Sequence, residues 1–460
     1  MNYNLREIVK ETDKRVVVVG LGKSGAACVK YLVQIGIKPL VMDTRATPPR
    51  LGEVEGIVEK QDIVLNGLDE KVLKNAAIII LSPGVSLKEK QLIAAAKCCV
   101  PIIGEIELFA QDVNAPVIAI TGSNGKSTVT TLVGMMLESC GKTAAVGGNL
   151  GTPALELLQK SVPDYYVLEL SSFQLETVFS LDAAASVILN ITEDHMDRYI
   201  GIADYSLAKK RTLRGHGRVV VNMDEESLIN IESCLDKSRE ICRFGLSKPN
   251  ENEFGILIDN DKEYLAFGNK KILACSDVKM PGQHNLSNAL AAMALTQVAS
   301  ADFEKMAEML REFPGLPHRT QWVAEVKGVN WYNDSKATNV GATIAAVNGM
   351  PGKLVLIMGG DGKGADFSEL SDVFADKVFG VILIGRDAAI IEKEIKDVCK
   401  TVNAKDMNQA VKSALNLALE LGADSVLLSP ACASWDMFCD GYVQRGIIYS
   451  QEVRELIKWK

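Results

Sequence analysis

The residues with the clearest chemical pattern form a glycine-rich run, TGSNGKST, at positions 121–128. A short apolar run ending at Ile120 predicts a strand before it, and Val129–Leu137 predicts a helix after it. Backbone N–H groups of such a loop surround phosphate oxygens, while Lys126 contacts the β- and γ-phosphates and Ser127 binds Mg²⁺. Because Ile120 stands where GxxxxGK[ST] has its first glycine, we predict a variant phosphate-binding loop.

A phosphate loop of this kind needs an acidic side chain to hold its metal ion. Glu169 lies in an apolar setting, LEL at 168–170, at the end of a predicted strand. His195 follows another predicted strand among three acids, at the sheet edge where nucleotide-binding folds bind their ligands. Residue types alone leave alternatives open, because Glu169 could be a buried, paired acid and His195 part of a surface salt-bridge cluster.

The basic run Lys209–Arg211 falls on a further predicted helix. Runs of like charge usually form a solvated helix face. Residue types alone therefore predict that these three side chains point toward water.

A second glycine motif, GLGKSG at 20–25, follows Val16–Val19 and precedes a predicted helix, and Asp43 ends the next predicted strand. Glycines in this context let the backbone approach a phosphate closely, and the acid can accept hydrogen bonds from a ribose or a base. Taken alone, the motif predicts a dinucleotide site, as in an NAD-dependent oxidoreductase. The same glycine motif could instead bind another nucleoside diphosphate. It could also be a turn that needs small residues only to let the helix pack closely.

The glycine motifs each follow a predicted strand, so the strands of a sheet must position them. Short β-branched runs alternate with helix-like stretches along nearly the whole chain. That alternation predicts parallel sheets covered by helices, an α/β fold. The clearest predicted strands are Val16–Val19, Leu40–Met42, Ile78–Leu81, Val117–Ile120, Tyr166–Leu168, Ser186–Leu189, Val219–Val221, Leu354–Ile357, Val381–Ile384 and Ser425–Leu428.

The chain has 460 residues, too many for one hydrophobic core, and about 150 residues per domain predicts roughly three domains. The segment 101–105 and the FPGLP run at 313–317 mark the expected joints. We therefore expect domains at 1–104, 105–315 and 316–460. Polar residues between short apolar pairs predict a hairpin within 250–268.

The charge, the apolar runs and the cysteines of the chain limit its possible binding partners and its location in the cell. A net charge of −8 provides no general basic field for nucleic acid or an anionic membrane. Apolar runs are too short to span a bilayer, and the first residues lack the apolar core of a signal peptide. The ten cysteines contain no CxxC pair and no zinc-ligand spacing. We expect a cytoplasmic protein with reduced thiols.

In order along nearly the whole chain, the motifs are similar to those of the Mur ligases of peptidoglycan synthesis. The strings that carry the resemblance are GLGKSG at 20–25, MDTR at 42–45, SPG at 82–84, TGSNGKST at 121–128, GGN at 147–149, LELSSFQLE at 168–176, NITEDHMDRY at 190–199, GQHNLSNALAA at 282–292, LPHR at 316–319, NDSKATN at 333–339, GGDGKGADF at 359–367 and LLSPACASWD at 427–436.

The strings NDSKATN, GGDGKGADF and SPACAS favour the family member that adds D-glutamate. Relatives that extend the peptide further, or that add glutamate to folates, share mainly the phosphate-loop, Glu and His elements. The resemblance implies a Rossmann-like N-terminal domain, a central P-loop ATPase-like domain with a mostly parallel sheet and a C-terminal Rossmann-like α/β domain. It implies an ATP-dependent ligase that joins D-glutamate to UDP-N-acetylmuramoyl-L-alanine through an acyl phosphate. We expect the protein to be a monomer.

Site residues follow from the resemblance at matching positions. The UDP-substrate set is Lys23, Ser24, Asp43, Thr44, Arg45, Gly84 and Asn149. The ATP set is Gly122, Ser123, Asn124, Gly125, Lys126, Ser127, Thr128, Asn285, Asn288, Arg319 and Asp334. The D-glutamate set is Thr338, Lys363, Ser434 and Tyr442, the last at a position where the family more often has Phe.

The resemblance also implies a catalytic set with two Mg²⁺ ions. One ion would be held by Ser127 and Glu169, and the other by His195 and a carbamylated Lys209. Lys126 and Lys336 would offset the charge that develops during phosphoryl transfer.

Residue types alone give simpler interpretations for two members of the D-glutamate set. Lys363 in its glycine-rich turn could belong to a second phosphate loop. Ser434 could cap the helix predicted to begin near Trp435.

Overall fold

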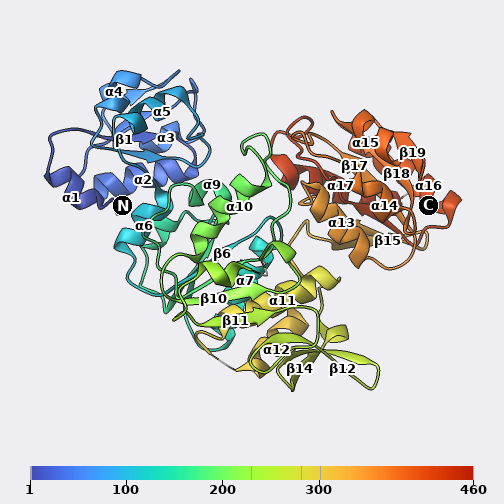
Figure 1. Ribbon diagram of the computed structural model, residues 1–460. Helices are drawn as coiled ribbons and strands as arrows, with labels where there is room; N and C mark the ends of the chain where they lie inside the picture. Colours follow the sequence, from blue (N-terminus) through green and yellow to red (C-terminus); the bar gives the residue numbers. More distant parts are fainter. Residues whose placement is uncertain (1–2, 229, 281, 301, 459–460) are drawn as a thin grey trace.

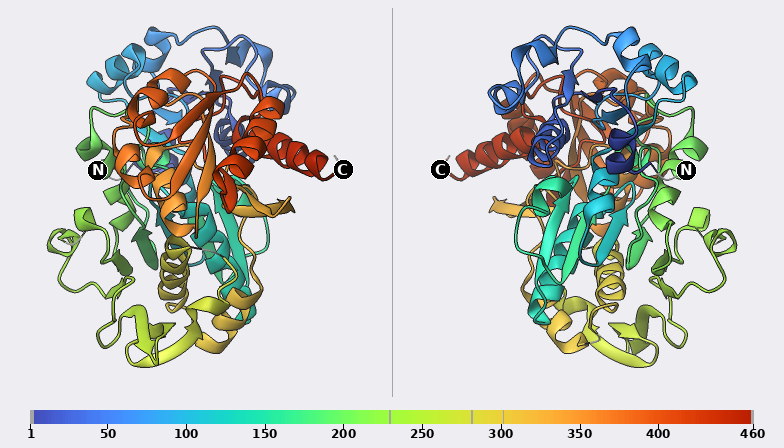
Figure 2. Two further views of the ribbon diagram at one scale, coloured as in Figure 1. Left: turned by 90° about the vertical axis from the view of Figure 1, so that its right-hand side faces the viewer. Right: turned by 90° about the vertical axis from the view of Figure 1, so that its left-hand side faces the viewer.

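The computed structural model describes residues 3–228, 230–280, 282–300 and 302–458. Within them the chain forms three α/β domains, each built on its own sheet. The N-terminal domain (blue) and the C-terminal domain (orange to red) both lie on the same side of the central domain (Figure 1). Figure 2 shows this arrangement from two further sides. The predicted three-domain α/β fold is confirmed.

The N-terminal domain has a five-stranded parallel sheet in the order β3-β2-β1-β4-β5. Its β1 is apolar at every position because both faces are covered: Val16 and Val18 pack on one side, Val17 and Val19 on the other. The elements are α1 (Leu5–Lys10), β1 (Val16–Val19), α2 (Lys23–Gln34), β2 (Leu40–Met42), α3 (Leu51–Val54), β3 (Ile63–Val64), α4 (Glu70–Lys74), β4 (Ile78–Leu81), α5 (Lys90–Lys97) and β5 (Ile102–Gly104).

The central domain has a nine-stranded sheet in the order β14-β13-β12-β11-β10-β9-β6-β8-β7. Its elements are α6 (Glu105–Asp112), β6 (Val117–Thr121), α7 (Lys126–Ser139), β7 (Ala144–Gly148), α8 (Ala154–Leu157), β8 (Tyr165–Glu169), α9 (Ser172–Leu175), β9 (Ala185–Ile188), α10 (Ile202–Lys210), β10 (Arg218–Asn222), β11 (Ile241–Phe244), β12 (Phe254–Asp259), β13 (Lys262–Phe267), β14 (Lys270–Ala274), α11 (Gln283–Thr296) and α12 (Phe303–Glu312).

Strand direction in the central sheet explains where a ligand can bind. The sheet is parallel from β7 through β12, and the last two strands pair antiparallel. The hairpin predicted within 250–268 is confirmed as β12 and β13. Because β6 lies between β8 and β9, the loops that follow these three strands meet at one edge of the sheet.

The C-terminal domain has a six-stranded sheet in the order β15-β16-β20-β17-β18-β19, parallel except for β15. Its elements are β15 (Gln321–Val326), β16 (Val329–Asn333), α13 (Val340–Gly349), β17 (Leu354–Gly359), α14 (Glu369–Phe374), β18 (Val378–Ile384), α15 (Ala388–Ile395), β19 (Lys400–Asn403), α16 (Met407–Leu421), β20 (Ser425–Leu428) and α17 (Gly441–Lys458). Each strand predicted from the sequence overlaps an observed strand.

The hydrophobic cores show how the domains are joined. One continuous core contains Val18 and Ile80 of the N-terminal sheet together with Ala119 and Leu168 of the central sheet. The C-terminal sheet has separate cores on its two faces. The first two domains therefore share buried apolar contacts, whereas polar contacts join the third domain to the central one at the site described below.

Two further observations bear on cellular context. In the part of the chain that the structure describes, no helix has the length and apolar character needed to cross a membrane. The structure describes all ten cysteines, and each is a free thiol.

Candidate active site

The first cavity lies at the carboxyl ends of three strands of the N-terminal sheet. Because β1 lies between β2 and β4, the loops after these strands meet at the switch point where open α/β sheets bind ligands. The cavity has a volume of about 450 Å³ and also borders the central domain. Its walls include the whole predicted UDP-substrate set: Lys23, Ser24, Asp43, Thr44, Arg45, Gly84 and Asn149.

Asp43 holds Arg45 at the wall of this cavity. Its carboxylate accepts hydrogen bonds from the backbone N–H groups of Leu21 (2.7 Å) and Arg45 (2.8 Å), and from Nε (2.8 Å) and Nη2 (2.7 Å) of Arg45. Burial raises the pKa of Asp43, but these hydrogen bonds outweigh it and lower the pKa below its ordinary value. A carboxylate has about four acceptor sites, so donors of the protein itself occupy those of Asp43. The group that faces the cavity is therefore the half-exposed guanidinium of Arg45.

The phosphate loop connects β6 to α7. Gly125 precedes α7 with a φ of +81°, and a Cβ there would lie 2.4 Å from Oδ1 of Asn288. This position therefore requires glycine. Ile120 is buried within β6, so the loop starts later, at Gly122, and a glycine at position 120 has no role in it.

Lys126 and Ser127 begin α7, where free backbone N–H groups favour bound phosphate. Nζ of Lys126 donates hydrogen bonds to the carbonyl oxygens of Gly122 and Ser123, both at 2.8 Å. Burial lowers the pKa of Lys126, and the charge of Glu169 opposes that shift. The ammonium group thus lies at the loop, close to an acidic side chain.

Glu169 ends β8 beside the phosphate loop and is only 3% exposed. Its Oε1 accepts a hydrogen bond of 2.6 Å from Nδ2 of Asn149. Its Oε2 is buried and has no hydrogen-bond partner among the described residues. A buried carboxylate oxygen without a donor is costly, so the predicted role as a metal ligand fits this side chain, whereas the alternative of a fully paired acid does not.

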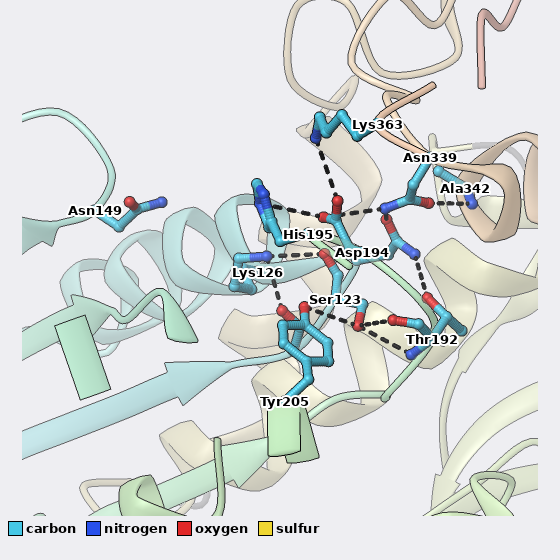
Figure 3. A network of polar contacts seen from close by, with 12 residues as sticks. Ser123, Lys126, Asn149, Thr192, Asp194, His195, Tyr205, Asn339, Ala342 and Lys363 are labelled. Carbon is cyan, nitrogen blue, oxygen red and sulfur yellow. Dashed lines mark hydrogen bonds and ion pairs between the residues drawn. The ribbon is translucent and has the colours of Figure 1, made fainter. Parts of the chain in front are cut away.

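His195 and Asp194 lie in the loop after β9, where the C-terminal domain meets the central one (Figure 3). Asp194 lies 3.6 Å from Nε2 of His195 and 3.3 Å from Nζ of Lys363. Asn339 reaches the same place, because its Nδ2 lies 3.4 Å from both Oδ2 of Asp194 and Oδ1 of Asn124. Burial lowers the pKa of His195 to about 4, leaving a neutral imidazole.

Lys209 is buried on the face of α10 that packs against the phosphate loop, with an exposure of 1%. Its Nζ donates a hydrogen bond of 2.8 Å to the carbonyl oxygen of Gly122 and lies 4.4 Å from the centre of the Tyr205 ring. Burial lowers its pKa well below the ordinary value. The interpretation of Lys209–Arg211 as a solvated face is therefore wrong for Lys209, because tertiary packing covers that side of the helix.

The second cavity, of about 410 Å³, lies between the central and C-terminal domains. Its walls bring together residues of the predicted phosphate, metal and D-glutamate sites, along with Asn149 of the predicted UDP-substrate set. They are Ser123, Asn124, Gly125, Lys126, Ser127, Asn149, Glu169, His195, Lys209, Arg319, Lys336, Thr338, Lys363, Ser434 and Tyr442. Asn149 also lines the first cavity, so the two volumes meet at this side chain.

The third cavity, of about 270 Å³, also borders the phosphate loop and shares Asn124 and Gly125 with the second cavity. Buried Asp334 accepts hydrogen bonds from the Thr320 N–H (3.0 Å) and the Ser429 hydroxyl (3.2 Å), and burial raises its pKa to about 7. Burial lowers the pKa of Lys336 to about 8. Predicted ATP residues in its walls are Asn124, Gly125, Thr128, Asn285, Asn288, Arg319 and Asp334.

The arrangement can support a specific kind of chemistry. A phosphate loop with a buried carboxylate suits ATP and Mg²⁺. A second volume that contains both this loop and lysine side chains from another domain can hold an acid and an amine beside the γ-phosphate. Such a site can activate a carboxylate by phosphorylation and shield the reactive product from water.

Comparison with known proteins identifies the family. Residues 14–104 match the model of the Mur ligase MurD-like N-terminal domain, 120–296 the Mur ligase middle domain and 318–432 the Mur ligase glutamate ligase domain. A UDP-N-acetylmuramoylalanine–D-glutamate ligase from Nitrosococcus oceani is 46% identical over 96% of each chain. One from Pseudomonas aeruginosa is 46% identical over 97% of this chain and 99% of its own. The chain belongs to the Mur ligase family.

Solved structures agree with this Mur ligase in fold. A pseudomurein peptide ligase type C from Methanothermus fervidus matches with a TM-score of 0.60 at 19% identity, over 97% of this chain and 100% of that one. A UDP-N-acetylmuramate-alanine ligase from Thermotoga maritima matches with a TM-score of 0.57 at 18% identity, over 96% and 98%. The NAD-dependent oxidoreductase alternative is not favoured, since the family match extends over all three domains.

The predicted site residues of this Mur ligase come together in space. All of them except Gly122 line one of the three cavities. Gly122 lies within the phosphate loop, and its carbonyl oxygen accepts hydrogen bonds from Lys126 and Lys209. Tyr442 lines the second cavity, and its ring centre lies 4.2 Å from Nζ of Lys336.

The walls of the second cavity also contain residues that were not among the predicted site residues of this Mur ligase, and four of these are Phe173, Asp194, Tyr205 and Asn339. Three of them lie inside the family strings, where the motif context was a usable signal. Tyr205 lies four residues before Lys209 on α10, and that spacing places two side chains on one helix face.

Proposed function

We propose that this Mur ligase joins D-glutamate to the alanyl carboxylate of UDP-N-acetylmuramoyl-L-alanine, with hydrolysis of ATP to ADP and phosphate. The observation that carries the proposal is the second cavity. It contains the phosphate loop and Glu169 from the central domain, Lys363 and Ser434 from the C-terminal domain, and Asn149, which borders the cavity of the N-terminal domain. The D-glutamate ligase activity of the relatives named above supports the choice of amino acid.

We assign the first cavity to the uridine diphosphate. Lys23 and Ser24 begin α2, where the helix N-terminus and an ammonium group favour a diphosphate. Arg45 presents a planar guanidinium beside Thr44 and Gly84. Asn149 stands where this cavity meets the second one, a suitable position for the sugar between the diphosphate and the reacting carboxylate.

Arg45→Ala is expected to raise KM for UDP-N-acetylmuramoyl-L-alanine about tenfold and to leave kcat nearly unchanged. Arg45 lies in the first cavity, away from the reacting groups, so its loss removes binding that substrate and transition state share. Steady-state kinetics with the UDP substrate as the varied component measures this. Arg50→Ala is the matched control, because Arg50 pairs with Glu53 in the same domain and lies outside the walls of that cavity. A large fall in kcat for Arg45→Ala would contradict the assignment.

We assign the phosphate loop and the third cavity to ATP. Backbone N–H groups from Gly122 to Thr128 would surround the phosphates, and Asn285, Asn288, Arg319 and Asp334 would border the nucleotide. Two Mg²⁺ ions fit the donors present. The unpaired Oε2 of Glu169 and the hydroxyl of Ser127 would hold one, and His195 with a carbamylated Lys209 the other. When bound, Mg²⁺ neutralises charge on the phosphoryl oxygens.

Carbamylation of Lys209 would supply a metal ligand that the unmodified side chains around it lack. Among the described residues, no group of three or more His, Cys, Asp or Glu side chains could hold a metal ion. A carbamate would add an anionic oxygen donor beside His195 and Glu169. A buried lysine with a lowered pKa is the nucleophilic, neutral amine that reacts with CO₂.

We assign D-glutamate to the C-terminal wall of the second cavity. Thr338, Lys363 and Ser434 offer two hydroxyls and an ammonium group for its carboxylates, with Tyr442 beside them. Because Lys363 pairs with Asp194 of the central domain, the amino acid would be held at the surface where the two domains meet.

The proposed reaction then follows from these positions. The alanyl carboxylate attacks the γ-phosphorus of ATP, giving an acyl phosphate and ADP, while Lys126 and Lys336 stabilise the developing charge. The amine of D-glutamate, having lost a proton, attacks the acyl carbon, and phosphate leaves as the amide forms. Contact between the central and C-terminal domains excludes water from the acyl phosphate. Because one chain builds all three cavities, we propose that a monomer acts, in the cytoplasm where ATP is available.

The test compares phosphate release from ATP in four reactions with UDP-N-acetylmuramoyl-L-alanine. They contain D-glutamate, L-glutamate, D-aspartate or no amino acid. We expect rapid release with D-glutamate and far slower release in the other three. Equal rates in all four would overturn the proposal, and phosphate release that needs no UDP substrate would indicate a simple nucleotidase.

A further inference from the structure

Arg198 links the N-terminal domain to the central one. Its Nη1 donates a hydrogen bond of 2.8 Å to the carbonyl oxygen of Pro83, and its Nη2 lies 3.3 Å from that of Val85. Pro83 and Val85 flank Gly84, and all three line the first cavity. The guanidinium thus holds the loop after β4 that forms one wall of the proposed UDP site.

The same guanidinium is held from the central domain. Nη2 of Arg198 forms an ion pair of 2.6 Å with Oε2 of Glu176, which follows α9. The guanidinium carbon lies 4.0 Å from the centre of the Phe173 ring, within cation–π range. Because α9 comes directly after β8, this contact reaches the segment that carries Glu169.

The backbone of Arg198 belongs to the loop that carries His195. Its N–H donates a hydrogen bond of 2.9 Å to the carbonyl oxygen of His195. Phe173 also contacts the His195 ring, with centroids 4.7 Å apart. On the N-terminal side, Nζ of Lys88 donates a hydrogen bond of 2.5 Å to the carbonyl oxygen of Arg198. One residue therefore connects the UDP-site loop with both proposed metal-binding segments.

The contacts of Arg198 require a specific geometry, because its one planar guanidinium donates to acceptors from two domains. The side chain is 12% exposed, so its removal would leave Glu176 and two carbonyl oxygens short of a donor. A lysine carries the same charge but lacks the planar set of five N–H donors. The contacts of Arg198 therefore depend on the guanidinium itself.

We propose that Arg198 is a positioning residue that couples binding of the UDP substrate to binding of the metal–nucleotide. The inference rests on the proposed function, because it uses the assigned UDP and metal sites. A UDP substrate that orders the loop at 83–85 would, through Arg198, favour the arrangement of His195 and Glu169 that accepts Mg²⁺ and ATP. Coupling of this kind is reciprocal between the two ligands.

The experiment measures the affinity of the full chain for Mg²⁺ with the non-hydrolysable analogue AMP-PNP by calorimetry. Titrations are run with and without saturating UDP-N-acetylmuramoyl-L-alanine. In the wild type we expect the UDP substrate to tighten nucleotide binding about fivefold or more. In Arg198→Ala and Arg198→Lys the tightening should fall below about twofold. The matched control is Arg218→Ala, because Arg218 is 14% exposed and pairs with Glu240 inside the central domain.

The outcomes are distinct. Wild-type tightening in Arg198→Ala, or the same loss in Arg218→Ala, would overturn the inference, and so would a wild type that binds both ligands without any coupling. A wild type that does not bind the UDP substrate at all would instead contradict the proposed function. As a second readout, Arg198→Ala should raise KM for the UDP substrate and for ATP together while KM for D-glutamate stays within about twofold, a pattern that general destabilisation does not produce.

Discussion

Replacing Lys126 by alanine is expected to lower kcat for D-glutamate addition by about 10³-fold. Lys126 begins α7 and its ammonium group lies at the phosphate loop, within the second cavity. In the proposed ATP site it would contact the oxygens that gain charge as the γ-phosphoryl group leaves ADP. A buried ammonium acts in a medium of low dielectric, where a lost charge is not replaced well by water.

The measurement is single-turnover phosphate release with saturating ATP, UDP-N-acetylmuramoyl-L-alanine and D-glutamate. Saturation separates the chemical step from weaker nucleotide binding. Lys142→Ala is the matched control, because Lys142 follows the opposite end of the same helix. We expect its rate to stay within about twofold of the wild type. A loss below about tenfold for Lys126→Ala, in a folded protein, would remove Lys126 from the catalytic set.

Replacing Lys209 by alanine is expected to lower kcat by about 10²-fold or more. The prediction follows from the proposed carbamate, because the variant loses an anionic ligand of one metal ion. Lys209 also donates to the Gly122 carbonyl oxygen in the phosphate loop, so its loss disturbs the loop as well. Lys210→Ala is the control next to it. Lys210 is half-buried and outside the walls of the three cavities, so its variant should keep activity within about twofold.

A direct observation separates the carbamate from the simple ammonium. The wild type and Lys210→Ala, incubated with ¹³C-bicarbonate and Mg²⁺, should show a ¹³C NMR signal of a carbamate carbon that Lys209→Ala lacks. If Lys209→Ala loses activity and no variant shows the signal, Lys209 acts as a cation at the loop instead. If Lys210→Ala loses the signal, the modified residue was assigned to the wrong lysine.

The strands were predictable because this fold buries both faces of its sheets. In β6, Ile118 and Ile120 pack on one side while Val117 and Ala119 pack on the other, so the first four positions of the strand are apolar and the run is conspicuous in the sequence. The hairpin of β12 and β13 was predictable for a different reason, since polar turn residues interrupt short apolar pairs. Motifs that follow such strands could therefore be placed at sheet edges.

The relation between domains was not predictable from local patterns. The ion pair of Lys363 with Asp194 joins residues 169 positions apart, and no periodicity marks it. The role of Asp43 also depends on tertiary contacts, because its four hydrogen bonds come from its own neighbour and from the glycine loop. Lys209 shows the same limit, since a charge run on a helix gives no sign that another segment covers one of its side chains.

The resemblance to the Mur ligases supplied what residue types alone did not. It indicated which of two adjacent lysines would be the carbamylated metal ligand, and of the two only Lys209 is buried. It also grouped Thr338, Lys363 and Ser434 as one set, and they share a cavity wall. Simple interpretations of Lys363 as a second phosphate loop and of Ser434 as a helix cap would have separated them.

The central claim is that the three cavities serve one reaction, in which ATP activates the alanyl carboxylate and D-glutamate then accepts the acyl group. The most direct test uses UDP-N-acetylmuramoyl-L-alanine labelled with ¹⁸O in its carboxylate, together with ATP, Mg²⁺ and D-glutamate. We predict that one ¹⁸O atom appears in the inorganic phosphate for each amide formed, as phosphate NMR or mass spectrometry can measure. Amide formation with no ¹⁸O in the phosphate, or phosphate release without amide, would contradict the proposed reaction.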